Sequence, residues 1–244
     1  MPVTEYLIRN AELYPDEVAL VELNPDEKDT RRTTWKEFDL IQPSANMPYR
    51  REITWSVFNE KANRFANMLI SRGVKKGDKV AILMYNCLEW LPIYFGVLKT
   101  GAIAVPFNFR YDSDEIYYCA ELAQVDVIVF GFAFIGRIEV NAERLLRGRL
   151  LIYVGDNCPS FAESYHELVA DCSSKEPDVK ITEDDYGAIY FSSGTTGFPK
   201  AILHKHQSLT QAAIMEQKHH SFIYPTTLSY RSKVPLDGKP CCRK

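Results

Sequence analysis

The sequence predicts an α/β fold in which helices cover both faces of a parallel sheet. Short segments of almost continuous apolar residues alternate with longer segments in which apolar residues recur at helical spacing. Unbroken apolar strands are typical of a parallel sheet that is buried on both faces, whereas a half-exposed strand would alternate. A strand followed by a helix, repeated along the chain, favours consecutive β-α-β units.

The N-terminal region is expected to form a helix, a strand and a long surface segment. Residues 4–14 fit a short helix with Thr4 as a candidate N-cap, and residues 17–23 alternate enough for a strand. Residues 24–51 are polar and interrupted by prolines, so no regular element is expected there.

The next expected elements are a short strand at residues 53–55 and a helix at residues 56–71, which Gly73 ends. The apolar positions that predict this helix are Val57, Phe58, Ala62, Phe65, Ala66, Leu69 and Ile70.

The repeating units follow this helix. Strands are expected at residues 80–84, 102–107, 125–130 and 150–154. Helices are expected at residues 87–100, 113–123, 142–147 and 160–172. An acidic linker at residues 178–185 then precedes a strand at residues 187–191. We expect the carboxylates of this linker to be solvated rather than catalytic.

The composition is that of an ordinary globular protein. The 244 residues suffice for one large or two small domains, with 46% apolar and 25% charged residues. The net charge of −3 gives no electrostatic case for nucleic acid, so no nucleic-acid partner is expected.

The sequence predicts a cytoplasmic protein without a signal peptide or a transmembrane segment. The N-terminus has neither a basic start nor an apolar core. The most apolar stretch, residues 80–109, is interrupted by Asn86, Glu89, Pro92 and Lys99, which a membrane span would rarely tolerate. The six cysteines form no C-x-x-C pair, which favours reduced thiols.

The segment YFSSGTTGFPK, residues 190–200, is the strongest candidate for a binding site. Its glycines tolerate positive φ and let a ligand approach the backbone. Its hydroxyls donate hydrogen bonds, and bared amides in such a turn form an anion-binding nest. One lysine adds a positive charge, so the segment suits a polyphosphate. The candidate residues are Ser192, Ser193, Gly194, Thr195, Thr196, Gly197 and Lys200.

Two well-known phosphate motifs do not match this segment. The P-loop needs a lysine directly after its second glycine and then a helix, but Phe198 and Pro199 intervene and the apolar residues 201–203 continue as a strand. The dinucleotide fingerprint G-x-G-x-x-G is absent. The structural alternative is a plain turn that joins two strands of a hairpin.

The string from Ser192 to Lys200 resembles the phosphate-loop signature of the AMP-forming adenylating enzymes, a family that includes acyl- and aryl-CoA ligases. His206 lies where these ligases often carry a histidine. Residues 53–64 and residues 96–106 resemble two further core segments of the family, in the family's order. The resemblance implies the layered parallel-sheet subdomain of the adenylating-enzyme N-terminal domain.

The resemblance also implies a two-step reaction. A carboxylate attacks the α-phosphorus of ATP to give an acyl-adenylate, and the thiol of coenzyme A then attacks the acyl carbon. The implied cofactors and partners are ATP, Mg²⁺, coenzyme A and a carboxylic acid, fatty or other acyl. The loop would grip the β- and γ-phosphates, with Lys200 as the catalytic charge partner, and no residue is assigned to a metal.

The end of the chain departs from the family pattern. Family members continue with an adenine-binding segment, a hinge and a small domain with a catalytic lysine, and none of these is found here. Residues 219–244 show neither helical nor strand periodicity. We therefore expect a truncated adenylation domain at residues 1–218, an atypical tail at residues 219–244 and poor solubility of the isolated chain.

Three alternatives to a working ligase site remain. The chain could be a non-catalytic remnant that binds nucleotide weakly or acts through protein contacts. The G-x-x-G segment could bind RNA as in KH domains, although the charge of the chain disfavours this. His204 and His206 would share one face of a strand and could bind a metal, but a structural role is favoured because no partner ligand is evident.

Overall fold

The computed structural model describes residues 1–23, 50–192 and 199–219. The chain divides into two units, residues 1–210 and 211–244, and the fold described below is that of the first unit. Its N-terminal elements are α1 (Val3–Leu13), β1 (Val18–Leu23), β2 (Arg50–Thr54) and α2 (Trp55–Ser71).

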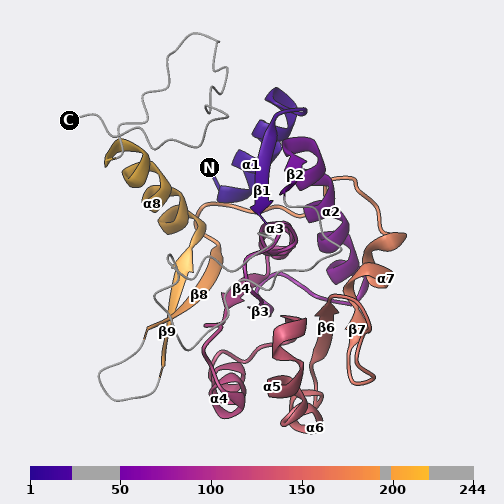
Figure 1. Ribbon diagram of the computed structural model, residues 1–244. Helices are drawn as coiled ribbons and strands as arrows, with labels where there is room; N and C mark the ends of the chain where they lie inside the picture. Colours follow the sequence, from indigo (N-terminus) through magenta and orange to yellow (C-terminus); the bar gives the residue numbers. More distant parts are fainter. Residues whose placement is uncertain (24–49, 193–198, 220–244) are drawn as a thin grey trace, which may run out of the picture. The chain divides into compact units, whose positions relative to one another are not determined.

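The central elements follow in alternation (Figure 1). They are β3 (Lys79–Leu83), α3 (Trp90–Lys99), β4 (Ile103–Pro106), α4 (Ser113–Leu122) and β5 (Val127–Gly131). Next come a 3₁₀ turn η1 (Phe132–Phe134), α5 (Ile135–Glu139), α6 (Ala142–Leu145), β6 (Leu150–Val154), β7 (Glu163–Ser164) and α7 (Tyr165–Ala170). The last elements are β8 (Tyr186–Ser192), β9 (Lys200–Lys205) and α8 (His206–His219).

The predicted α/β fold with a parallel sheet is confirmed. Seven strands form one sheet in the order β7-β6-β5-β3-β4-β8-β9. Every neighbouring pair is parallel except the last, in which β9 runs antiparallel to β8. A separate antiparallel pair consists of β1 and β2.

Successive residues of the central strands fill two cores on opposite faces of the sheet. In β3, Ala81 and Leu83 pack with α4 and α5, whereas Val80 and Ile82 pack with α2 and α3. This two-sided burial explains why the strands are almost continuously apolar in sequence. Figure 1 shows the corresponding helices on either side of the sheet.

The helix expected at residues 56–71 is present with the predicted ending. It begins one residue earlier, because Thr54 is its N-cap and accepts a hydrogen bond from the amide of Val57 at 3.4 Å. Gly73 adopts φ +86°, a conformation that glycine accepts without strain. Trp55, expected in the preceding strand, is therefore the first helical residue.

Three other expectations need correction, and two helices were not expected. Thr4 is not an N-cap: α1 starts at Val3 after Pro2, whose fixed φ suits a helix start, and Thr4 is buried. The helix expected at residues 87–100 starts only at Trp90. The helix expected at residues 160–172 is shorter, because β7 pairs with β6 within this range and α7 begins only at Tyr165. The short helix α5 and the helix α8 were not expected. Residues 24–49 lie outside the described residues.

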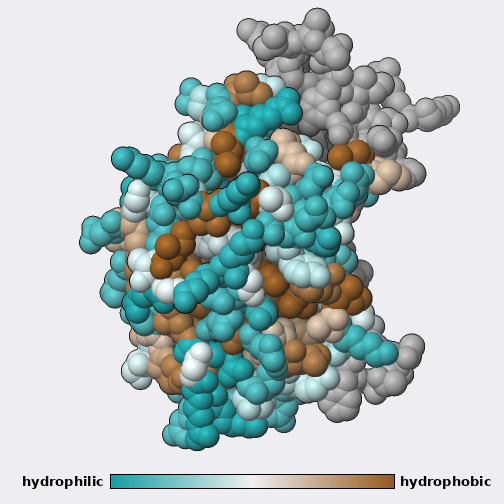
Figure 2. Space-filling model, turned by 180° about the vertical axis from the view of Figure 1, so that it is seen from behind, coloured by the Kyte–Doolittle hydropathy of each residue, from teal (hydrophilic) through white to brown (hydrophobic). Residues whose placement is uncertain are grey.

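Apolar side chains also reach the surface of the described residues. Figure 2 shows hydrophobic patches scattered between hydrophilic ones on one face. Ile202 and Leu203 of β9 are about half exposed, at 47% and 45%. Scattered apolar side chains are normal on protein surfaces. The exposed apolar side chains do not test the expected poor solubility of the isolated chain, which stays a prediction.

Gly96 of α3 packs closely against helix α2. A Cβ at Gly96 would lie 2.8 Å from the carbonyl oxygen of Ala62 and 2.9 Å from Cδ1 of Phe65. We expect Gly96→Ala to lower the free energy of unfolding by about 1–3 kcal/mol, because the two helices must separate.

The matched control for this prediction is Gly136→Ala in α5, where a Cβ would meet nothing within 4 Å. This control should be neutral or stabilising by up to about 1 kcal/mol, because alanine favours the helix. Urea unfolding followed by tryptophan fluorescence measures both variants. Equal stabilities of the two variants would show that the helices do not need glycine at position 96.

Candidate functional site

The hydroxyl- and glycine-rich segment joins the antiparallel strands β8 and β9. In their ladder Ser192 pairs with Lys200, so the two ends of the segment face each other, and both residues are exposed. The structure thus brings together two of the predicted site residues. The other five, Ser193, Gly194, Thr195, Thr196 and Gly197, lie outside the described residues.

The chain enters the segment at the carboxyl end of the parallel strands. Ala188 of β8 pairs with Ala104 of β4 in parallel, so Ser192 lies at the edge where β4 also ends. Ligands of open α/β sheets bind in the crevice outside the carboxyl ends of the strands. The predicted site residues therefore lie at the edge of the sheet where a ligand is expected.

Aromatic packing fixes the position of β8 near this edge. The ring of Phe191 lies 5.8 Å from that of Phe107 and 6.4 Å from that of Tyr111. On the other face of the sheet, the hydroxyl groups of Tyr190 and Tyr94 are 2.9 Å apart and share a hydrogen bond. Contacts on both faces of the sheet thus fix the position of β8 as far as the residue before Ser192.

The loops after β3, β4 and β5 form an aromatic layer at the same edge. The ring of Tyr85 lies 5.8 Å from that of Phe109 and 5.1 Å from that of Phe134. The Nη1 atom of Arg137 donates hydrogen bonds to the carbonyl oxygens of Phe109, at 2.6 Å, and Tyr111, at 3.1 Å. Arg137 was not singled out from the sequence alone. The signal that could have found it is its position shortly after the carboxyl end of β5.

The acidic linker is a loop, as expected, and three of its carboxylates form ion pairs near the base of the hairpin. Lys76 contacts Asp185 at 2.6 Å, and Lys205 contacts Asp184 at 3.1 Å. Glu183 contacts the N-terminal ammonium group at 2.5 Å. Partial burial raises the pKa of Asp185, but hydrogen bonds from Lys76 and Thr182 outweigh it and lower this pKa overall. The carboxylates of Glu183 and Asp184 are solvated as expected, at 51% and 78% exposure, whereas that of Asp185 is 22% exposed.

The two histidines that follow the loop do not share a strand face. Strand β9 ends at Lys205, and His206 is the first residue of α8. The ring of His204 packs edge-on against Tyr190, with centroids 5.3 Å apart, whereas His206 is fully buried. Among the described residues no group of three metal-binding side chains exists. The expectation of one shared face is wrong, because the backbone turns helical between the two residues.

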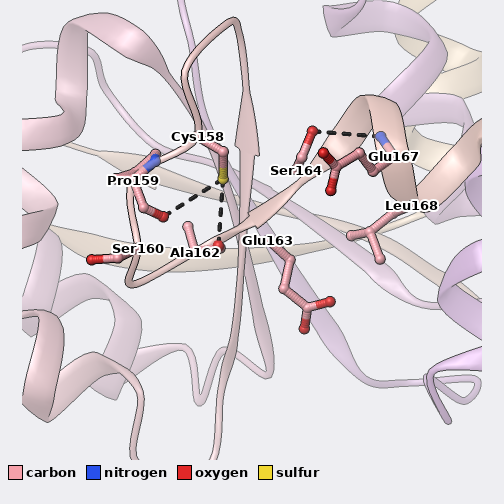
Figure 3. Close-up of a pocket in the computed structure, with 8 residues that line it drawn as sticks. All are labelled: Cys158, Pro159, Ser160, Ala162, Glu163, Ser164, Glu167 and Leu168. Carbon is pink, nitrogen blue, oxygen red and sulfur yellow. Dashed lines mark hydrogen bonds between the residues drawn. The ribbon is translucent and has the colours of Figure 1, made fainter.

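A hollow of about 410 Å³ lies away from the hairpin (Figure 3). It is lined mainly by β7 and the residues that flank it, at the opposite edge of the sheet from β9. The thiol of Cys158 shares its one proton between the carbonyl oxygens of Ala162, at 3.4 Å, and Pro159, at 3.6 Å. Burial raises the pKa of Cys158, so its thiol stays protonated and is a poor nucleophile. The hollow contains none of the predicted phosphate-binding residues.

Comparisons with known proteins show the family to which the chain belongs. Residues 7–236 match the model of the AMP-binding enzyme family. Since this match covers most of the chain, the chain belongs to the family of AMP-binding enzymes. The long-chain-fatty-acid–CoA ligase FadD13 of Mycobacterium tuberculosis is 32% identical over 174 residues, which are 71% of this chain and 33% of that protein.

Solved structures show the same fold. The anthranilate–CoA ligase AuaEII, in complex with anthranoyl-AMP, superposes with a TM-score of 0.73 at 24% identity, covering 88% of this chain and 36% of that one. The N-terminal domain of FACL13 from Mycobacterium tuberculosis gives a TM-score of 0.68 at 25% identity, covering 89% of this chain and 47% of that one. The present chain spans about a third of the length of the curated relative.

No helix in the part of the chain that the structure describes is both long enough and apolar enough to cross a membrane.

Proposed function

We propose that this chain carries the ATP phosphate-binding loop of an acid–CoA ligase. In the intact ligase, a carboxylic acid is activated to an acyl-adenylate and then transferred to coenzyme A. One observation carries the proposal: the hairpin places Ser192 opposite Lys200 at the carboxyl end of the parallel sheet, and the glycine- and hydroxyl-rich segment connects them.

The residues present fit a polyphosphate. The exposed ammonium group of Lys200 can neutralise phosphate oxygens, and the hydroxyl of Ser192 can donate a hydrogen bond to them. We assign further phosphate contacts to Ser193, Gly194, Thr195 and Thr196, with Gly197 allowing the backbone to approach. Magnesium, when bound, would supply additional neutralisation of the phosphates. The protein groups would hold the pyrophosphate while the carboxylate attacks.

The acid substrate is proposed only as a carboxylic acid, fatty or other acyl. The printed names of the relatives specify different acids, a long-chain fatty acid in one and anthranilate in another. Because the chain covers only a third of the curated relative, groups that select the acid in such ligases can lie outside it. We also propose a cytoplasmic location for the intact ligase.

A second candidate is a nucleotide-binding remnant without catalysis. The observation in its favour is the same limited coverage, since the chain matches 33% of the fatty-acid ligase. The RNA-binding alternative is less favoured, because β8 and β9 flank the segment as a hairpin and the net charge is −3.

Isothermal titration of the chain with ATP and magnesium tests the proposal. We expect saturable binding of ATP, because the hairpin presents donors and a positive charge to the phosphates, and no competing binding of an RNA oligonucleotide. Acid-dependent exchange of pyrophosphate into ATP then separates a working site from a remnant. Absence of saturable ATP binding by the folded chain would contradict both candidates.

A further inference from the structure

His206 is a fully buried titratable group that the proposed function does not use. It begins α8 directly after β9, and its exposed fraction is 0%. Neither Nδ1 nor Nε2 of its ring has a hydrogen-bond partner among the described residues. A buried imidazole in this setting is tolerated when neutral, whereas a buried charge without a partner is strongly unfavourable.

The ring fills a space that β8 leaves open at Gly187. A Cβ at Gly187 would lie 3.3 Å from Cδ2 and Nε2 of His206 and 3.3 Å from Cδ1 of Leu209. The backbone amide of His206 donates a hydrogen bond of 2.9 Å to the carbonyl oxygen of Asp185. The imidazole therefore packs against the strand that leads into the phosphate segment, at the base of the hairpin.

The charged groups around His206 are already paired with one another. Asp185 precedes β8 and binds Lys76, which lies between α2 and β3. Glu183 binds the N-terminal ammonium group, and Lys205 binds Asp184. Burial lowers the pKa of His206; Asp185 opposes this shift and Lys76 adds to it. Among the described residues, Asp185 is thus the carboxylate that favours a protonated ring, but it is paired with Lys76 and accepts no hydrogen bond from the ring.

We propose that His206 is an acid-sensitive latch for the β8–β9 hairpin. As a neutral ring it packs against Gly187 and holds β9 and the start of α8 on β8. When protonated, the ring leaves this site for water, and the hairpin opens at its base. The consequence for nucleotide binding rests on the proposed function, but the latch itself does not.

The direction of the pH effect follows from the lowered pKa. The unfolded or opened chain binds a proton at about pH 6.5, the ordinary value for histidine. Since the closed form binds it only at lower pH, the latch stabilises the hairpin fully above this value. The stabilisation is lost progressively as the pH falls below about 6.5 toward the lowered pKa of the closed form.

Amide hydrogen exchange of residues 200–206 tests the proposal without nucleotide, so a failed latch and a failed nucleotide site are distinguishable. After correction for the intrinsic pH dependence, we expect exchange at pH 5.5 to be faster than at pH 7.5 by up to about tenfold, because the open form titrates at about pH 6.5, one pH unit above the lower of the two conditions. His206→Phe should abolish this difference, because phenylalanine does not titrate. His166→Phe, which removes an exposed histidine of α7, should leave it intact.

Carbon-detected NMR titration of the histidine rings covers the case in which His206→Phe does not fold. The ring of His206 in the unsubstituted chain is expected to titrate below pH 6.5, together with the opening of residues 200–206. A pKa at or above 6.5 would overturn the proposal. So would an acid-induced opening that persists in a folded His206→Phe variant.

Discussion

Replacing Lys99 by methionine is expected to lower the free energy of unfolding by about 2–4 kcal/mol, toward the range found when one partner of a buried ion pair is removed. The Nζ atom of Lys99 donates to Oδ1 of Asn59 and Oδ1 of Asn63, both at 2.7 Å, and to Oε1 of Glu176 at 2.5 Å. Its side chain is 1% exposed, whereas that of Glu176 is 40% exposed. Methionine keeps the packing of the stem but removes all three hydrogen bonds.

The loss should fall mainly on the two asparagines. Glu176 can turn to water, but the amide oxygen of Asn63 is buried with the lysine. Asn63 also donates to the carbonyl oxygen of Ser174 at 3.0 Å, so the segment before β8 depends on the same cluster. Burial lowers the pKa of Lys99 and Glu176 opposes this, which indicates that the carboxylate helps to keep the ammonium group charged.

Urea unfolding of Lys99→Met and of a control, Lys61→Met, measures this effect. Lys61 lies on the neighbouring helix α2, is 35% exposed on its side chain and is 3.8 Å from Glu89. Its replacement should cost about 1 kcal/mol or less, because the pair is long and Lys61 is partly exposed, although Glu89 is only 14% exposed. If the two variants lose equal stability, the buried cluster does not stabilise the fold as argued.

Replacing Lys200 by alanine is expected to weaken ATP binding roughly 10- to 100-fold, because a hydrogen bond to a charged group contributes about 1.5–3 kcal/mol. Lys200 is the first residue of β9 and pairs with Ser192 at the end of the hairpin ladder that adjoins the glycine- and hydroxyl-rich segment. Removing its ammonium group leaves the hairpin intact and takes away one positive charge from the proposed phosphate site. Isothermal titration with ATP and magnesium gives the change in Kd.

Lys205→Ala is the matched control for this experiment. Lys205 is the last residue of the same strand and pairs with Asp184 at the base of the hairpin, 3.1 Å away. Its loss changes the net charge by the same amount, so the long-range effect on ATP is similar and small. We expect a change in Kd of at most about twofold, since this lysine is distant from the loop and screened by salt. A Kd for Lys200→Ala within the same range would remove Lys200 from the proposed site.

The periodicity of single segments predicted most of the described elements. The strand expected at residues 150–154 matches β6 residue by residue, and the helix expected at residues 113–123 differs from α4 by one residue. Asp112 and Glu115 form a capping box at the start of α4, which is a local signal. Local propensity and burial on both faces of the sheet agree in these segments, so the sequence suffices.

Elements that depend on a neighbour were missed. The two residues of β7 are too few to show a period and are strand only because β6 lies beside them. The phosphate segment was located from its glycines, hydroxyls and lysine, but its place at the carboxyl edge follows from the pairing of β8 with β4. The partners of Lys99 come from two segments that are distant from it in sequence, helix α2 with Asn59 and Asn63 and the segment before β8 with Glu176.

The sequence by itself determined the α/β class, the family and the residues of the candidate loop, because these depend on apolar periodicity and on an ordered string of residue types. Only the tertiary structure decided the strand order, the antiparallel return of β9 and the burial of His206 against Gly187. Pairing and burial join residues that are distant in sequence, and their free energy depends on which surfaces meet in the folded chain. The sequence therefore gives no sign that His206 is buried, and only the fold shows that its titratable ring is excluded from water.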